Sequence, residues 1–209
     1  TLSDLVNKNT LSDIQELSCI LPAELVHYAQ LNIPAKSKQR ALQAIPFALE
    51  DQLAEEIDDL HFALGKAEKN IYPVACIQHD RFKSLIGAFD ELNLSLDKLY
   101  IDAICLPITD NSWSLLIIDN RLSIRLSTGE IINTDADNFE FFYTQLINQN
   151  QKQLPEQLII YCKDETQLAR LNLSDTINIT THYYGNSPLK PLVLLLCSPQ
   201  NINLLQGRY

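Results

Sequence analysis

The chain has few glycines, and the five that it has are widely separated: Gly65, Gly87, Gly129, Gly185 and Gly207. A loop that cradles phosphate needs glycines close together, because several backbone N–H groups must approach one anion. The spacing therefore argues against a Walker A loop and a G-x-G-x-x-G dinucleotide fingerprint. The G-x-S-x-G and H-E-x-x-H motifs are missing too, and the four histidines are scattered singly. We therefore expect no catalytic residue, no metal and no cofactor.

Disulfide signatures and long apolar runs are also missing. The cysteines are odd in number, form no C-x-x-C pair and lie in apolar contexts, so we expect free, buried thiols in a reducing cytosol at Cys19, Cys76, Cys105, Cys162 and Cys197. No run reaches the roughly 18 apolar residues of a membrane span; the run 192–197 predicts a buried strand. No signal peptide and no methionine are present, so we expect a fragment of a longer protein.

Basic residues are scarce. Sixteen Lys and Arg stand against 26 Asp and Glu, and the net charge is −10. A nucleic-acid-binding surface needs clustered basic side chains, so this class of partner is not expected. An acidic surface instead suits a basic protein partner, whose encounter it accelerates.

One segment concentrates the negative charge. No Lys or Arg occurs between Arg40 and Lys66. Within that stretch, residues 50–59 contain six carboxylates: Glu50, Asp51, Glu55, Glu56, Asp58 and Asp59. Leu49, Leu53, Ile57 and Leu60 recur at helical spacing, so the pattern predicts one amphipathic helix, with Pro46 in its first turn. The carboxylates form either a solvated helix face or a docking surface for a basic partner. A metal site is disfavoured because no turn-forming glycine is present.

The remaining patterns predict an α/β protein. Residues 36–99 suggest a helix, a β-hairpin joined by the loop 65–70, and a second helix. The second half predicts three strands, a helix, and then a strand, a helical stretch and a strand. This βββαβαβ order is typical of a ribonuclease-H-like, actin-type lobe.

Three stretches carry a resemblance to a known family. Residues 46–63 contain Pro-Phe-Ala-Leu-Glu-Asp-Gln-Leu-Ala, then acidic residues and Leu-His-Phe-Ala, and this segment resembles the cytoplasmic domain of the L protein of the type II secretion system. Residues 203–207, Asn-Leu-Leu-Gln-Gly, are similar to the end of that domain. Residues 113–116, Trp-Ser-Leu-Leu, give a third, looser match. The resemblance covers most of the chain in the same order.

The resemblance implies an actin-like α/β fold with an inserted αββα subdomain. Residues 1–35 and 100–111 would form the first lobe, residues 36–99 the insertion, and residues 112–209 the second, ribonuclease-H-like lobe. The family carries one more hairpin before the aligned region, so the first lobe here would lack its N-terminal hairpin.

The resemblance also implies a function: a non-catalytic component of the inner-membrane platform of type II protein secretion. The family's cytoplasmic domain recruits the secretion ATPase through the N-terminal domain of that enzyme and links it to the pseudopilus machinery. Other platform proteins would be further partners, a homodimer stays open, and this fragment would meet the membrane only through a tether after its C-terminus. The resemblance does not say which residues touch the ATPase, so the six carboxylates are a physical expectation.

Two alternatives remain. An active actin-like ATPase would hold Mg²⁺ and phosphate at the turn 116–121; Asp119 is in place, but Asn120 and Arg121 stand where small residues would admit a phosphate. A type IV pilus M-type scaffold would bind the N-terminal peptide of a partner. The Leu-His-Phe-Ala and Asn-Leu-Leu-Gln-Gly stretches favour the L family over this scaffold.

Overall fold

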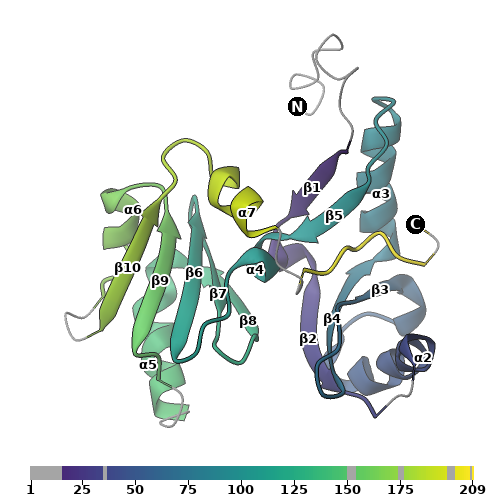
Figure 1. Cartoon of the computed structure of the whole chain (residues 1–209), viewed down its shortest axis with the longest axis horizontal. Coiled ribbons are helices and arrows are strands. Elements are labelled where there is room, and N and C mark those ends of the chain that lie inside the picture. Colours follow the sequence, from purple (N-terminus) through teal and green to yellow (C-terminus); the bar gives the residue numbers. More distant parts are fainter. Residues whose placement is uncertain (1–15, 35–36, 150–153, 174–176, 197–200, 208) are drawn as a thin grey trace.

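A computed structural model describes residues 16–34, 37–149, 154–173, 177–196, 201–207 and 209, and it contains three sheets (Figure 1). A five-stranded sheet lies on the left of Figure 1 and a three-stranded sheet on the right. The two-stranded sheet lies above the three-stranded sheet in this view, and the short helix α4 (Asp102–Cys105) lies between the left and right sheets. The chain is therefore an α/β protein built from separate sheets, as the sequence predicts.

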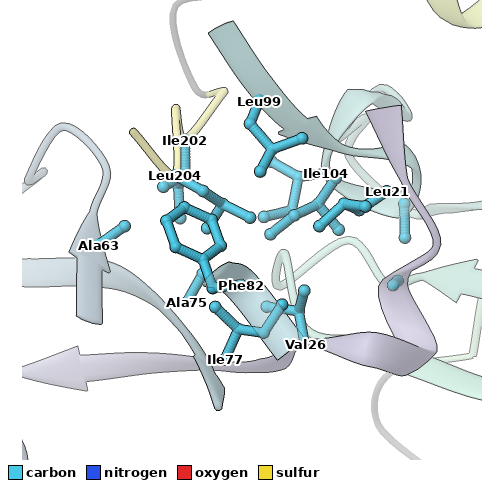
Figure 2. Packing of buried hydrophobic residues seen from close by; sticks show 13 residues of the cluster. Leu21, Val26, Ala63, Ala75, Ile77, Phe82, Leu99, Ile104, Ile202 and Leu204 are labelled. Carbon is cyan, nitrogen blue, oxygen red and sulfur yellow. The ribbon is translucent and has the colours of Figure 1, made fainter. Parts of the chain in front are cut away.

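The two-stranded sheet pairs β1 (Ser18–Leu21) with β5 (Lys98–Ile101) in parallel, and β5 runs directly into α4 (Asp102–Cys105). Its inward side chains join a core shared with α3 (His79–Asp90) and with the last residues of the chain. Figure 2 shows the ring of Phe82 beside Leu204, and both side chains are fully buried. The C-terminal segment, residues 201–207, therefore belongs to this core.

The three-stranded sheet is antiparallel, in the order β2 (His27–Asn32), β4 (Ile71–Gln78), β3 (Leu60–Leu64). Successive side chains of a strand point to opposite faces. One face carries Leu64 and Val74 against α2 (Lys38–Leu49), and the other carries Ala63 and Ala75 against the core around α3. The predicted hairpin and its connecting loop are confirmed, while the sheet also takes β2 from before residue 36.

The five-stranded sheet has the order β10-β9-β6-β7-β8. Its strands and helices follow along the chain as β6 (Ser112–Ile118), β7 (Arg121–Arg125), β8 (Ile131–Asp135), α5 (Phe139–Gln149), β9 (Gln157–Cys162), α6 (Glu165–Ala169) and β10 (Asn178–Tyr183). This is the predicted βββαβαβ order. Leu115 and Ile117 pack with the α5 side, whereas Leu116 packs against α4 and α7 (Leu189–Leu195) on the other face.

The acidic segment is not the helix that the sequence predicts. Helix α2 ends at Leu49 with Pro46 inside it, and the chain continues as two 3₁₀ turns, Glu50–Gln52 and Ile57–Asp59, separated by extended backbone at Leu53. Pro46 removes a backbone donor from the helix interior, and like charges four residues apart oppose its continuation. The buried helical stripe lies earlier, on α2 itself, at Ala41, Ile45 and Leu49.

The run 192–197 is not a buried strand either. Residues up to Leu195 form helix α7, in which Leu192 is buried while Val193 and Leu194 are exposed; Cys197 lies outside the described residues. A short apolar run carries no period that separates strand from helix. The leucine-rich composition favours a helix, and Pro191 sits in the first turn, where its missing N–H costs little.

The turn between β7 and β8 contacts β2 through a glycine. Gly129 has φ +88°, and a Cβ atom there would collide with the amide of Gln30 and lie 3.1 Å from Cδ1 of Ile108. Only glycine adopts this conformation without strain. A side chain at this position would therefore strain the backbone and push the flexible amide of Gln30 aside.

We expect Gly129→Ala to lower the free energy of unfolding by about 1–3 kcal/mol, through left-handed strain and the collision with Gln30. Urea denaturation measures the change. The control is Gly87→Ala in helix α3, where a Cβ would meet no atom within 4 Å; it should stabilise by about 0.5–1 kcal/mol. Equal effects of the two substitutions would contradict this account of the turn.

Candidate functional site

All six carboxylates that the sequence singled out are solvent-exposed. Glu50 and Asp51 lie on the 3₁₀ turn that follows α2, Glu55 and Glu56 lie in the connection, and the remaining two lie on the turn before β3: Asp58 and Asp59. The structure therefore brings them to the corner of the three-stranded sheet where β3 begins and β4 ends. None of the six forms an ion pair with another described residue.

Glu55 differs from the other five carboxylates because it also faces a groove. It accepts a hydrogen bond from Nε2 of Gln78 at 3.1 Å and lines a cavity of about 320 Å³ together with His27, Cys76 and Arg81. Burial lowers the pKa of His27, and the charge of Glu55 partly opposes this. Burial, followed by the charge of Glu55, raises the pKa of the Cys76 thiol to about 12, so this thiol stays protonated.

An aromatic side chain stands beside the acidic segment. Phe47, in the last turn of α2, is 77% exposed, and Leu42 on the same helix is 36% exposed. A large exposed apolar side chain within a polar rim is characteristic of protein–protein contact sites. We call Phe47 and the six carboxylates the acidic corner. The sequence named its charges but not its aromatic member, since the predicted helix placed Pro46 and Phe47 at a helix start.

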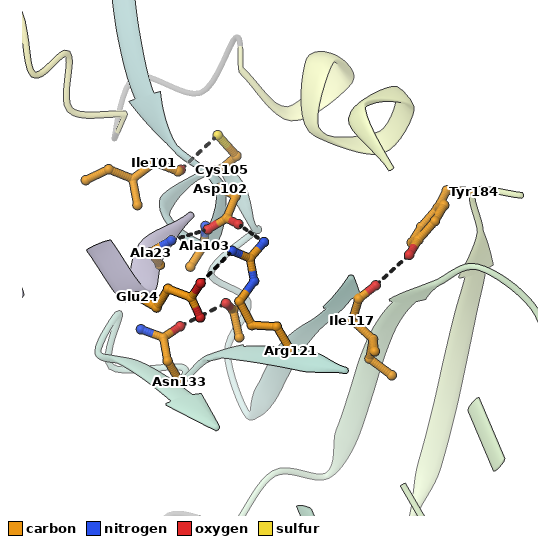
Figure 3. A network of polar contacts seen from close by, with 11 residues as sticks. Ala23, Glu24, Ile101, Asp102, Ala103, Cys105, Ile117, Arg121, Asn133 and Tyr184 are labelled. Carbon is orange, nitrogen blue, oxygen red and sulfur yellow. Dashed lines mark hydrogen bonds and ion pairs between the residues drawn. The ribbon is translucent and has the colours of Figure 1, made fainter. Parts of the chain in front are cut away.

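A buried carboxylate connects α4 to β7 (Figure 3). Oδ1 of Asp102 accepts from the backbone N–H groups of Ala23 at 2.8 Å and Ala103 at 2.6 Å, and Oδ2 pairs with Nη2 of Arg121 at 2.9 Å. Arg121 also reaches Glu24 at 3.6 Å. Burial raises the pKa of Asp102, whereas Arg121 and the two N–H groups lower it in part. The network therefore joins β7 to α4 and to residues 23–24.

The turn between β6 and β7, where an actin-like ATPase would hold phosphate, is filled by other side chains. The carbonyl of Asp119 accepts from Nε2 of Gln167 at 3.0 Å and from Nη1 of Arg170 at 3.2 Å. Arg170 also pairs with Asp137 through two hydrogen bonds and contacts Asn120. The described residues contain no group of three metal-ligating side chains. Nothing at this turn combines a nucleophile with a base.

The C-terminal segment contacts β5, β3 and the core residue Phe82 of α3. The sequence pattern did not predict these contacts. Oδ1 of Asn203 accepts from the N–H of Leu99 at 2.9 Å, and Nε2 of Gln206 donates to the carbonyl of Leu64 at 3.0 Å. The ring of His61, a nitrogen of which lies 2.7 Å from the carbonyl of Leu204, stacks on Phe82. His61 is thus a packed histidine, as expected, and the Asn-Leu-Leu-Gln-Gly stretch is structural.

The four described cysteines are free, as the sequence predicts: Cys19, Cys76, Cys105 and Cys162. Three of them are buried, whereas Cys19 is partly exposed. The fifth, Cys197, lies outside the described residues.

Comparison with known proteins decides the family. The family model described as "Type II secretion system (T2SS), protein L" matches residues 4–209. The chain belongs to this family. The resemblance seen in the sequence is therefore confirmed, and the family is a secretion component of the inner membrane with a cytoplasmic domain.

Curated members of the protein L family are similar over part of their length. The protein L of Pectobacterium carotovorum subsp. carotovorum is 34% identical over 117 residues, 56% of this chain and 28% of that protein. The protein L of Dickeya chrysanthemi is 33% identical over 53% of this chain and 28% of that protein. The protein L of Vibrio cholerae is 19% identical over 95% of this chain and 47% of that protein. The chain thus spans less than half of these relatives.

The fold matches that of a solved family member. The cytoplasmic domain of EpsL, an inner membrane component of the type II secretion system of Vibrio cholerae, superimposes with a TM-score of 0.78 over 98% of this chain and 83% of that one, at 18% identity. The predicted actin-like α/β fold is confirmed. Among the described residues, no helix is both long and apolar enough to cross a membrane.

We expect Arg121→Met to lower the free energy of unfolding by about 3 kcal/mol at pH 8, because it leaves the buried charge of Asp102 without its cation. Asp102 already has a raised pKa in the folded state. A raised carboxyl pKa costs stability fully above the folded-state pKa, and the cost fades as the group takes up a proton. The loss should therefore be smaller at pH 5 than at pH 8.

Urea denaturation at the two pH values measures both effects. Lys83→Met is the matched control, since Lys83 forms only an exposed pair with Asp80 at 3.7 Å. Such surface pairs contribute about 0–1 kcal/mol. An Arg121→Met loss that matches this control, or that grows toward pH 5, would show that Asp102 does not depend on Arg121.

Proposed function

We propose that this chain is a non-catalytic docking domain of the secretion platform, and that it recruits the secretion ATPase by binding the N-terminal domain of that enzyme. The acidic corner is the contact surface. The proposal rests on one observation: six carboxylates and an exposed phenylalanine share one corner of the fold, and no described cation pairs with any of the six. A basic surface on the partner would supply the missing positive charge.

The charge pattern suits recruitment. Uncompensated surface charge attracts an oppositely charged partner over a distance set by the salt concentration, and it raises the association rate more than the affinity. Phe47 contributes a large apolar side chain that can be desolvated at the centre of the contact, which the carboxylates cannot provide. Together they suit a partner surface with basic residues around an apolar depression.

Absence of catalysis is part of the proposal. The turn that would hold phosphate in an active actin-like enzyme lacks glycine, and its backbone carbonyl is hydrogen-bonded by Gln167 and Arg170. A phosphate would have to displace these contacts. Hydrolysis would therefore reside in the recruited ATPase, and this domain would hold that enzyme in place.

The family supplies the wider setting of the proposal. The domain would lie on the cytoplasmic side of the inner membrane, tethered through the chain that follows its C-terminus, and it would link ATP hydrolysis in the cytosol to the pseudopilus machinery. Other platform proteins of the system would be its remaining partners. A homodimer is compatible with this role.

Calorimetric titration with the N-terminal domain of the cognate secretion ATPase tests the proposal. We expect Asp51→Lys combined with Asp58→Lys to weaken binding at least about tenfold at low salt, since each reversal places like charges opposite one another. The matched control is Asp90→Lys with Glu91→Lys, the same charge change at the exposed end of α3. The control should weaken binding only about twofold, through net charge alone.

A second pair of variants separates the apolar contact from charge. Phe47→Ala should weaken binding by about tenfold without lowering the melting temperature, whereas Phe141→Ala, at a side chain 68% exposed on α5, should change neither. Binding that is tight but insensitive to the acidic-corner variants would move the interface elsewhere. Absence of binding by the unaltered domain would contradict recruitment itself.

A further inference from the structure

A separate cavity of about 260 Å³ lies between the three-stranded sheet and the turn that joins β7 to β8. Its polar walls include Tyr28 and Gln30 on β2, Lys66 and Glu68 on the β3–β4 loop, and Arg125 at the end of β7, and its apolar walls are Ile71 and Pro73 on β4 and Ile108. It is distinct from the acidic corner and from the β6–β7 turn. Its residues take no part in the proposed docking surface or in the turn that would hold phosphate.

Arg125 is the unusual member of this wall. The residue is 2% exposed, and Nη1 donates to the backbone carbonyls of Ile104 and Leu106. Its Nε is buried without a hydrogen-bond partner, and Arg125 forms no ion pair with any described carboxylate. Burial lowers the pKa of this guanidinium, whereas the charge of Tyr28, that of Cys105 and a side-chain hydrogen bond with Tyr28 partly oppose that change. A buried cation with an unused donor is costly unless something supplies an acceptor.

We propose that this cavity binds the carboxylate or phosphate group of a small anion, held by Arg125 and Lys66. A guanidinium offers a planar set of donors that matches both kinds of group. Lys66 is exposed at the rim and supplies a second, mobile charge. Tyr28 and Ser127 line the same space, and the hydroxyl of Tyr28 already accepts from Nε2 of Gln30 at 3.4 Å.

Charge and size define the ligand further. Two cations, Lys66 and Arg125, and one carboxylate, Glu68, line the cavity. A second carboxylate, Glu130, stands nearby and accepts from the hydroxyl of Thr128 at 3.1 Å. The volume falls below the usual range of about 300–1,000 Å³ for drug-sized ligands. The cavity therefore suits a compact anion or the charged end of a longer molecule rather than a nucleotide.

Occupancy would have a structural consequence. The ligand would contact β2, the β3–β4 loop and β7 at once, and so would tie the three-stranded sheet to the second lobe. A ligand that binds only the folded state raises stability by mass action. Anion binding should therefore raise the melting temperature in step with occupancy.

The Nε–H resonance of Arg125 in ¹⁵N-correlated NMR spectra reports on the unused donor directly. We expect inorganic phosphate and acetate, titrated at constant ionic strength, to shift this resonance with saturation. The same probes should raise the melting temperature. A short peptide with a free C-terminal carboxylate and the same peptide with an amidated C-terminus distinguish a chain end from a free anion. If only the peptide with the free carboxylate shifts the Nε–H resonance, the site binds chain ends.

Variants connect the shift to the cavity. Lys66→Gln should weaken anion binding about fivefold or more, while Lys69→Gln, which removes the same charge from a nearby residue outside the cavity wall, should change it less than twofold. Arg125→Lys keeps the charge but loses the planar fork, and should weaken binding further if it folds. An Nε–H signal that does not move overturns the proposal, and so does a non-saturating shift equal in both lysine variants, which would mark an adventitious ion only.

Discussion

The junction between the five-stranded sheet and the rest of the fold depends on one buried carboxylate. Asp102 stands at the start of α4, directly after β5, accepts two backbone N–H groups, and pairs with Arg121 of β7. A buried charge of this kind is tolerated only when its partners are all in place, so it favours one arrangement over its neighbours. Through this junction β7, which begins at Arg121 and ends at Arg125, is held against α4 and residues 23–24.

The C-terminal segment completes the same framework from the other side. Its buried residues Ile202 and Leu204 fill the core between β5 and the three-stranded sheet, while the side chains of Asn203 and Gln206 satisfy backbone groups on both. The C-terminal segment therefore holds β5 and the three-stranded sheet together through both apolar packing and hydrogen bonds.

Sequence reasoning succeeded where a pattern is local and failed where tertiary packing decides. The strands β6 to β8 and helix α3 were predicted because their periods and turns are written in consecutive residues. The prediction of an acidic helix was wrong because Leu49 and Leu60 fit one helical spacing but belong to different elements. Leu49 is the last residue of α2, and Leu60 is the first residue of β3. The prediction of a buried strand at residues 192–197 was wrong, because a short apolar run without a period does not distinguish a helix from a strand.

The candidate site was predictable to the same degree. The six carboxylates can be recognised from the sequence alone, since no Lys or Arg lies among them. Phe47 lies beside them because α2 extends past Pro46, and Arg125 lines one cavity with Tyr28 and Lys66 because distant parts of the chain converge there. No spacing rule in the sequence contains either fact.

Hydrogen–deuterium exchange of the domain, alone and saturated with the N-terminal domain of its secretion ATPase, tests the central claim most directly. The account predicts slower exchange at residues 42–60 in the complex and unchanged exchange in β9 and β10. Protection confined to other surfaces, with residues 50–59 unchanged, would contradict the acidic corner as the docking surface.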